Sequence, residues 1–374
     1  MKKIFKLATI TALLFLAFVT GAMAGTAFGI DGTLTGSLFT AGAMFAGAPK
    51  GALTLGIDIT QIDPSEIISD LSTYMKFPQN QSEFFRKLRN GLELAPYVRS
   101  IGNQKGKYIG VSTDSTELLQ AFQQGFTPKG TTSFVGYVNE IFRLKLDHSI
   151  TNIDTIVDSW VNYLSKEGVN RADWPLTRYI IEMEIIPILT EEMNTAMCRG
   201  SYVAPTTGTA GNSIDSMDGL LTIITREIDD LERITPIATG AISASNAVEK
   251  IELFADGIDP LVSDKGGIIL CSNTVARYYK SKYRATFGLT NDMQAKNNVN
   301  LDNYNIKLVP VNGFGTSQRL VFVTQGNLIH LYDQLISPSS FKVEENRRVV
   351  DIMADWHCAI GFNSIQGVFA NDQA

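Results

Sequence analysis

The 374-residue sequence predicts an α+β fold, in which helices and strands occupy different stretches of the chain. Three observations predict this class. A long helical period covers residues 173–197, strand-like runs concentrate after residue 305, and two extended segments between residues 107 and 146 enclose a Gly-, Thr- and Pro-rich stretch. Hydrophobic residues make up 44% of the chain and charged residues 19%, which is typical of a globular protein with two or three subdomains.

The first 24 residues have the layout of a secretory signal peptide. Three early lysines precede an apolar run from Leu7 to Val19, and an Ala-Met-Ala tripeptide ends at Ala24. The run is too short to predict a membrane-spanning helix. We therefore expect a signal-peptide-like leader over residues 1–24, with cleavage between Ala24 and Gly25.

The cysteines favour a different compartment. There are three of them, an odd number, and none lies in a Cys-x-x-Cys pair. Secreted proteins tend to pair their cysteines, whereas scattered single thiols are typical of a reducing compartment. The leader and the cysteines thus leave two localisations open.

The stretch from Lys105 to Leu164 is the most informative part of the chain. Residues 107–113 and 138–146 read as strands, and the apolar residues of the second strand alternate with polar ones, with one slip that indicates a bulge. The excursion that we place at residues 125–136 has few apolar side chains to bury. Such an arm adds little to the core of its own subunit, so we expect it to reach a neighbouring molecule.

Two helices follow the arm. Residues 153–164 carry apolar side chains at helical spacing, with Trp160 as a core anchor. The strongest helical period runs from Asp173, a candidate cap, to Met197. Pro175 suits its first turn, and Pro187 should kink the helix or relax one turn.

Shorter elements alternate after a Gly- and Thr-rich linker at residues 201–212. Helices are expected over residues 217–231 and 246–255, and a buried strand over residues 267–271. Ser272 should cap a basic helix that ends at Gly288. Its interleaved tyrosines and basic residues fit nucleic-acid contact, but an amphipathic helix that packs on a sheet explains them better.

The last part of the chain is rich in strands. Strands are expected at residues 305–311 and 320–323, around a Gly-Phe-Gly turn, and the run 327–335 is ambiguous. Further strand-like runs cover residues 341–346, 348–362 and 367–370.

The sequence nominates no active site. Its three histidines lack a second ligand at metal-binding spacing, and no nucleophile elbow, phosphate loop or dinucleotide fingerprint occurs. His357 and Cys358 are neighbours on a predicted strand, so their side chains should point to opposite faces. We therefore expect no enzymatic activity, no cofactor, no metal and no small-molecule substrate.

Several features together resemble the major capsid proteins of tailed bacteriophages, which have the Hong Kong 97-type shell fold. They are the run Gly-Phe-Thr-Pro-Lys-Gly at residues 125–130, the strand before Asp158-Ser159-Trp160, the long helix, the Gly-rich hinge and the string VVDIMADWHCAIGFNSIQGVF at residues 349–369. The resemblance covers roughly residues 65–374 by the order of the elements.

The resemblance implies a division of the chain. It comprises an N-terminal arm at 25–75, an extended loop region at 76–150, a peripheral domain with the spine helix at 151–200, an axial domain at 201–345 and C-terminal strands that return to the peripheral domain at 346–374. The loop residues implied to touch a neighbouring subunit are Phe126, Thr127, Pro128, Lys129 and Phe134.

The resemblance also implies a function. Subunits of this family form hexamers and pentamers of an icosahedral head that encloses double-stranded DNA without sequence specificity. Portal, scaffold and maturation-protease partners and assembly in the host cytoplasm belong to the same expectation. Two alternatives stay open: an exported protein, either a periplasmic or secreted binding protein or an envelope protein, which the leader favours, and an encapsulin-like shell protein.

Overall fold

The computed structural model describes residues 78–151, 153–166, 169, 174–288, 299–301, 304–333, 341–346 and 349–373. The chain separates into a unit over residues 1–63 and a unit over residues 64–374, and every described residue belongs to the second. The expected leader, the expected N-terminal arm at residues 25–75 and the Ala24–Gly25 cleavage site all lie outside the described residues. None of the described helices is long and apolar enough to cross a membrane.

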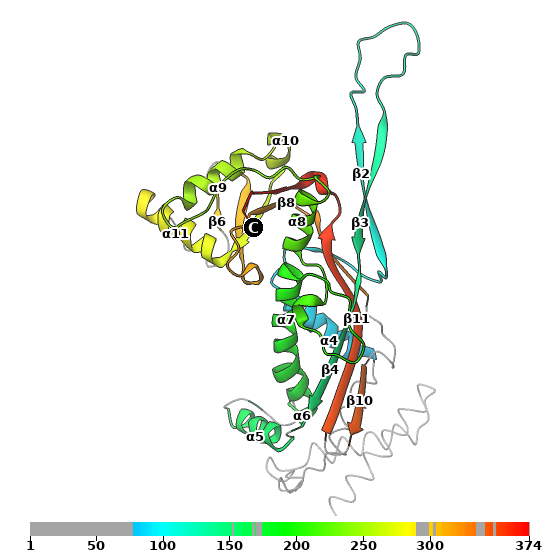
Figure 1. The fold of residues 1–374 in the computed structure, drawn as a ribbon, viewed down its shortest axis with the longest axis vertical. Helices are drawn as coiled ribbons and strands as arrows, with labels where there is room; N and C mark the ends of the chain where they lie inside the picture. Colours follow the sequence, from blue (N-terminus) through cyan, green and yellow to red (C-terminus); the bar gives the residue numbers. More distant parts are fainter. Residues whose placement is uncertain are drawn as a thin grey trace, which may run out of the picture. The chain divides into compact units, whose positions relative to one another are not determined.

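Two five-stranded sheets and a separate hairpin form the β structure, and together with the helices they confirm the predicted α+β class (Figure 1). The first sheet has the order β1-β9-β11-β10, and β4 also pairs with β11. Its strands are β1 (Arg99–Ile101), β4 (Phe142–Ile150), β9 (Leu328–Asp333), β10 (Phe341–Asn346) and β11 (Val349–Phe362).

The second sheet has the order β12-β8-β5-β7-β6. Its strands are β5 (Gly267–Ser272), β6 (Val299–Asn300), β7 (Ile306–Val311), β8 (Val321–Thr324) and β12 (Val368–Ala370). Strand β9 follows β8 in sequence but joins the first sheet, and β12 follows β11 but joins the second. The chain thus crosses between the two sheets three times, before β5, before β9 and before β12, and the predicted domain division stays a prediction.

The second sheet carries a large apolar core. Helices α9 (Ala247–Asp256) and α11 (Asn273–Phe287) cover it, and their buried apolar side chains form one cluster with those of β5, β7 and β8. The Ser272 hydroxyl accepts a hydrogen bond from the Val275 amide at 3.4 Å, and Gly288 ends α11 with a positive φ, as predicted. Tyr279 and Tyr283 are buried in this cluster, which supports the amphipathic interpretation of the basic helix.

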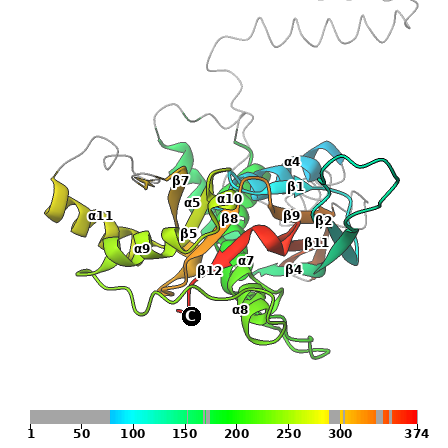
Figure 2. The same ribbon diagram turned by 90° about the horizontal axis from the view of Figure 1, so that it is seen from above.

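The described residues contain six further helices. They are α4 (Pro78–Asn90), α5 (Ile153–Leu164), α6 (Leu176–Tyr179), α7 (Ile186–Arg199), α8 (Leu220–Asp229) and the short α10 (Pro260–Ser263). The described residues also include three short 3-10 turns: η2 (Ser213–Asp215), η4 (Asn312–Phe314) and η5 (Ile365–Gly367). Figure 2 shows α7 between the two sheets.

The spine helix is continuous from Leu176 to Arg199 but changes its winding. A π-helical segment, η1 (Ile180–Ile185), separates α6 from α7, and the Ile186 amide donates to the carbonyl of Ile181, five residues back. Pro187 follows directly, and a proline ring collides with the carbonyl four residues earlier in a regular α-helix. The wider turn removes this collision, so the predicted relaxation near Pro187 is confirmed.

Two helix starts differ from the sequence-based expectation. Pro175 occupies the N-cap position of α6 rather than its first turn, and the expected cap Asp173 lies outside the described residues. The helix predicted over residues 217–231 is shorter and begins after Gly219.

The spine contacts the second sheet through the 3-10 turn η4. A Cβ added to Gly313 would lie 2.5 Å from the Cys198 sulfur and 2.7 Å from the Asn194 carbonyl oxygen, so only glycine fits against the spine.

We predict that Gly313→Ala lowers the free energy of unfolding by about 1–3 kcal/mol, the usual cost of overpacking a tight core. Denaturant unfolding followed by circular dichroism measures the change. Gly211→Ala is the matched control, because nothing lies within 4 Å of the position of its added Cβ. An unchanged midpoint for Gly313→Ala would contradict this close contact.

Candidate functional site

The hairpin of β2 (Lys107–Ser115) and β3 (Thr132–Glu140) is the candidate functional site. The two strands pair only with each other, in the register Lys107↔Glu140 to Ser115↔Thr132, and the hairpin extends away from the first sheet (Figure 1). The sequence-based excursion at residues 125–136 is therefore wrong in its second half, because β3 already begins at Thr132. Its β-branched and aromatic residues favour a strand.

The expected strand over residues 138–146 is two strands. β3 pairs with β2, β4 pairs with β11, and Ile141 alone joins them, with its amide bonded to the Gly106 carbonyl at 2.9 Å. The predicted slip in the alternation lies at this junction, where the chain changes partner rather than bulging within one ladder.

The buried side of the strand also changes at the junction. In β4 the alternation is as predicted, with Leu144 buried and Arg143 exposed. In β3 it is inverted, because Asn139 is buried and Val138 is 48% exposed. The hairpin therefore buries polar groups against the rest of the subunit and exposes apolar ones.

Asn139 fixes the base of the hairpin to β11. Its side-chain amide donates to the Phe362 carbonyl at 2.9 Å, and its side-chain oxygen accepts from the Phe362 amide at 3.2 Å. A Cβ on Gly361 would lie 1.9 Å from that oxygen, so a glycine is required there. Gly110 makes a similar approach to the Asn363 backbone, with 2.1 Å between its added Cβ and the carbonyl oxygen. Two glycines thus let the hairpin lie directly on the end of β11.

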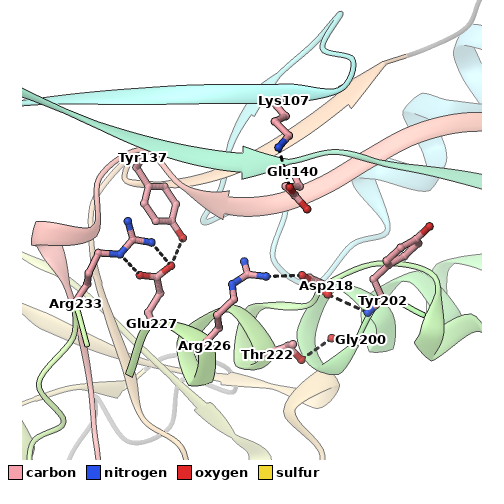
Figure 3. Close-up of polar contacts among 10 residues, drawn as sticks. All are labelled: Lys107, Tyr137, Glu140, Gly200, Tyr202, Asp218, Thr222, Arg226, Glu227 and Arg233. Atoms are coloured by element: carbon pink, nitrogen blue, oxygen red, sulfur yellow. Dashed lines mark hydrogen bonds and ion pairs between the residues drawn. The ribbon is translucent and has the colours of Figure 1, made fainter. Parts of the chain in front are cut away.

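Tyr137 fixes the same face to α8 (Figure 3). Its hydroxyl donates to Glu227 at 3.2 Å, and Glu227 also accepts two bonds from Arg233, each at 2.7 Å. Glu227 is 1% exposed, so its charge depends on these partners. Burial raises the pKa of the Tyr137 hydroxyl well above its usual range, and the Glu227 carboxylate raises it further. The phenol therefore stays a neutral donor.

Helix α8 is in turn bound to the end of the spine (Figure 3). Thr222 donates to the Gly200 carbonyl at 2.6 Å, and Asp218 accepts from the Arg226 side chain at 2.8 Å and from the Tyr202 amide at 2.9 Å. The hairpin, α8 and the spine are thereby linked through polar contacts.

A second attachment lies where the chain enters β2. Lys105 forms an ion pair with the nearly buried Asp333 at 3.1 Å, and the Gln104 amide donates to the Tyr332 carbonyl at 3.2 Å. Both partners belong to β9. The base of the hairpin is therefore held by two strands of the first sheet, β11 through Asn139 and β9 through Lys105 and Gln104.

The far end of the hairpin is exposed. Residues 116–131 connect the strands, and their large apolar side chains are 60–96% exposed: Leu118, Leu119, Phe122 and Phe126. Local bonds order this connection, since Lys129 pairs with Glu117 at 3.0 Å and donates to the Leu119 carbonyl at 2.9 Å.

The residues predicted to contact a neighbouring subunit all lie in this exposed half. Phe126, Thr127, Pro128 and Lys129 belong to the connection, and Phe134, which is 74% exposed, lies on β3. Their role in subunit contact stays a prediction. Sequence reasoning missed Asn139 and Glu227, because their partners lie 223 and 90 residues away and no local spacing marks them.

One histidine and one cysteine form a core contact rather than a reactive pair. His330 Nε2 lies 3.3 Å from the Cys358 sulfur, and both residues are buried. Burial lowers the pKa of His330 to about 4 and raises that of Cys358 to about 12, which keeps both neutral. Within the described part of the chain, no group of three or more metal-ligating side chains is placed to hold an ion.

Comparison with known proteins finds solved structures in which the chain follows a similar course. No family model and no curated protein matches the sequence. The structure is similar to the satellite phage P4 procapsid, with 14% identity, a TM-score of 0.49, and coverage of 78% of this chain and 98% of that one. It is also similar to the capsid of the empty GTA particle, with 10% identity, a TM-score of 0.48, and coverage of 75% and 89%.

A third similar structure is the SrpI encapsulin complex from Synechococcus elongatus, with 10% identity, a TM-score of 0.41, and coverage of 75% of this chain and 86% of that one. At these identities the matches describe a similar course of the chain, and what this protein does must be inferred from its own residues.

We predict that Glu227→Ala lowers the free energy of unfolding by roughly 2–3 kcal/mol, because the mutation leaves Arg233 and the Tyr137 hydroxyl without their acceptor. The cost lies below that of a fully buried pair, since the Arg233 side chain is 41% exposed. Amide hydrogen exchange should accelerate in β2 and β3 more than in the second sheet. Uniform acceleration would contradict the role of Glu227 as an anchor.

The three cysteines should be unreactive in the folded subunit. Each is buried, and burial raises the pKa of each thiol to about 12. At pH 8 a maleimide should therefore label the native protein slowly and label all three thiols after denaturation. Rapid labelling of the native subunit would contradict this burial.

Proposed function

We propose that this protein is a structural subunit that assembles with copies of itself into a closed shell. The observation that carries the proposal is the hairpin, which is firmly bound at its base and exposes large apolar side chains along its distal half. Exposed apolar groups of this size mark interaction surfaces in soluble proteins. A two-stranded hairpin is also marginally stable alone, so its distal half gains stability from a partner.

The shell that fits best is the head of a tailed phage or prophage, with this chain as the major capsid subunit. The resemblance in element order supports this choice, and it brings the expectations of hexamers and pentamers, packaged double-stranded DNA, and portal, scaffold or protease partners. The charge distribution supports contact between copies. Residues 76–150 carry ten Lys and Arg against six Asp and Glu, whereas residues 151–374 carry eighteen against twenty-seven.

The double substitution Phe122→Ser and Phe126→Ser tests the proposal. We expect the native protein to form shells and the variant to form only small species. The two rings are 96% and 95% exposed in the subunit, so their replacement removes no packing contact within the subunit. Sedimentation velocity and negative-stain electron microscopy measure the particles. The melting temperature should change little, as for most surface substitutions.

Gln124→Ser is the matched control, since it lies between the two rings in the same exposed connection and removes no apolar group. It should assemble normally. Deletion of residues 127–134 is a harsher version of the same test. A native protein that stays monomeric under all assembly conditions, or normal shells from the double variant, would contradict the proposal, and particles filled with cellular protein would favour the encapsulin-like alternative.

A further inference from the structure

The segment after α4 carries a carboxylate that binds the 3-10 turn η4. Glu93 Oε2 accepts from the Asn312 backbone amide at 2.8 Å and from the Gly313 amide at 3.2 Å, and Glu93 Oε1 accepts from the Asn312 side-chain amide. The Glu93 amide itself donates to the Asn194 side chain of the spine at 2.9 Å. We call these four residues the Glu93 clasp: Glu93, Asn194, Asn312 and Gly313.

The peptide bond inside the clasp is held from several directions. Both sequence neighbours of Glu93 are buried leucines. The Gly315 amide donates to the Asn312 carbonyl at 2.9 Å, which closes the turn, and the Asn273 side chain donates to the Asn312 side-chain oxygen. Gly313 is buried against the spine. The peptide between Asn312 and Gly313 therefore cannot rotate while the clasp is closed.

The two residues inside the clasp are chemically labile. In an Asn-Gly pair, glycine has no Cβ to hinder the attack of its own nitrogen on the preceding side chain. The Gly313 nitrogen bonds to Asn312 Cγ, the Cγ–Nδ2 bond breaks, and the proton of the attacking nitrogen leaves with the ammonia. Water, which reaches the exposed Asn312, then opens the cyclic imide to an aspartate or an isoaspartate.

The clasp opposes this reaction in two ways. The peptide must turn until the Gly313 nitrogen faces Cγ, and this rotation breaks the bonds to Glu93 and to the Gly315 amide. The attacking nitrogen must also lose its proton, and the negative charge that develops would lie beside the Glu93 carboxylate. A like charge at this distance disfavours the ionised form.

The product no longer fits the clasp. The Asn312 side-chain nitrogen, which donates to Glu93 Oε1, becomes a carboxylate oxygen. A donor is thus replaced by an acceptor, and two negative charges face each other where a hydrogen bond had been. Because Glu93 connects η4 with Asn194, repulsion here acts on the contact between the second sheet and the spine.

We propose that Asn312 and Gly313 form a self-modification site, which Glu93 keeps unreactive in the folded subunit and whose deamidation releases η4 from the spine. Water is the only co-reactant. The inference concerns the subunit itself and does not depend on the proposed shell. The modification is irreversible, so it acts as a one-way switch on this contact.

Glu93→Gln tests the protection. The variant keeps the size of the side chain and one acceptor oxygen but removes the charge. Incubation at mildly alkaline pH, followed by peptide mass spectrometry, should show deamidation at residue 312 about ten-fold or more faster than in the native protein, because the site reacts only when it opens locally. Glu192→Gln, an exposed position of the spine, is the matched control and should leave the rate unchanged.

Asn312→Asp reproduces the product and tests the release. Amide hydrogen exchange at Gly313 should accelerate about ten-fold or more, because the clasp opens more often. Combining it with Glu93→Gln should restore most of the protection, since the new side-chain amide donates to the new carboxylate. A general loss of packing would not be rescued in this way.

The native chain gives a measurement that needs no variant. Deamidation at residue 312 should be far slower in the folded protein than in denaturant, and equal rates would overturn the protection. A Glu93→Gln rate equal to the native rate would also overturn it, and a slower one would make Glu93 the base that promotes the reaction. Native exchange at Gly313 in Asn312→Asp would overturn the release.

Discussion

The two hydrogen bonds between the Asn139 side chain and the Phe362 backbone are the contact on which the hairpin depends. A buried amide is costly unless its donor and acceptor are both used, and here one backbone residue satisfies both. The contact in turn requires the bare backbone of Gly361, because a Cβ there would collide with the amide oxygen. The geometry at the base therefore determines the direction of an element that has no core of its own.

This constraint explains why the hairpin has inverted polarity. Burial of polar groups at its base is possible because Phe362 and Glu227 offer specific partners for them. The apolar residues of these strands are thereby left on the outside. Strand β4, one residue farther along the chain, has the ordinary arrangement, with Leu144 inside. Ile141 thus separates a strand that buries its apolar residues from one that exposes them.

Local chemistry made part of this structure predictable. The helix at residues 153–164 and the helix capped by Ser272 follow from side-chain period, a hydroxyl at the N-cap and a glycine at the end, all of which are neighbours in sequence. The relaxed turn follows from one proline, Pro187. The class of the fold and the exposed arm are likewise visible in composition and period.

The remainder depends on contacts that sequence period does not encode. Alternation gives a strand but not its partner, so residues 138–146 read as one strand although they belong to two ladders. The same alternation predicts that Val138 is buried and Asn139 exposed, because it considers only the hydropathy of each residue. It contains no information on the Phe362 backbone, which binds the buried Asn139 side chain. Strand β9, which the sequence left ambiguous, is defined by its pairing with β1 and β11.

The unbroken backbone through Ile141 has a mechanical consequence. A pull on the hairpin along its length passes directly into β4, which is paired with β11 from Phe142↔Cys358 to Ile150↔Val350. The hydrogen bonds of this ladder lie perpendicular to the strands, so such a load shears them all at once instead of peeling them one by one. The hairpin is therefore built to bear tension along its axis, and it should yield far more easily to a force that bends it sideways at its base.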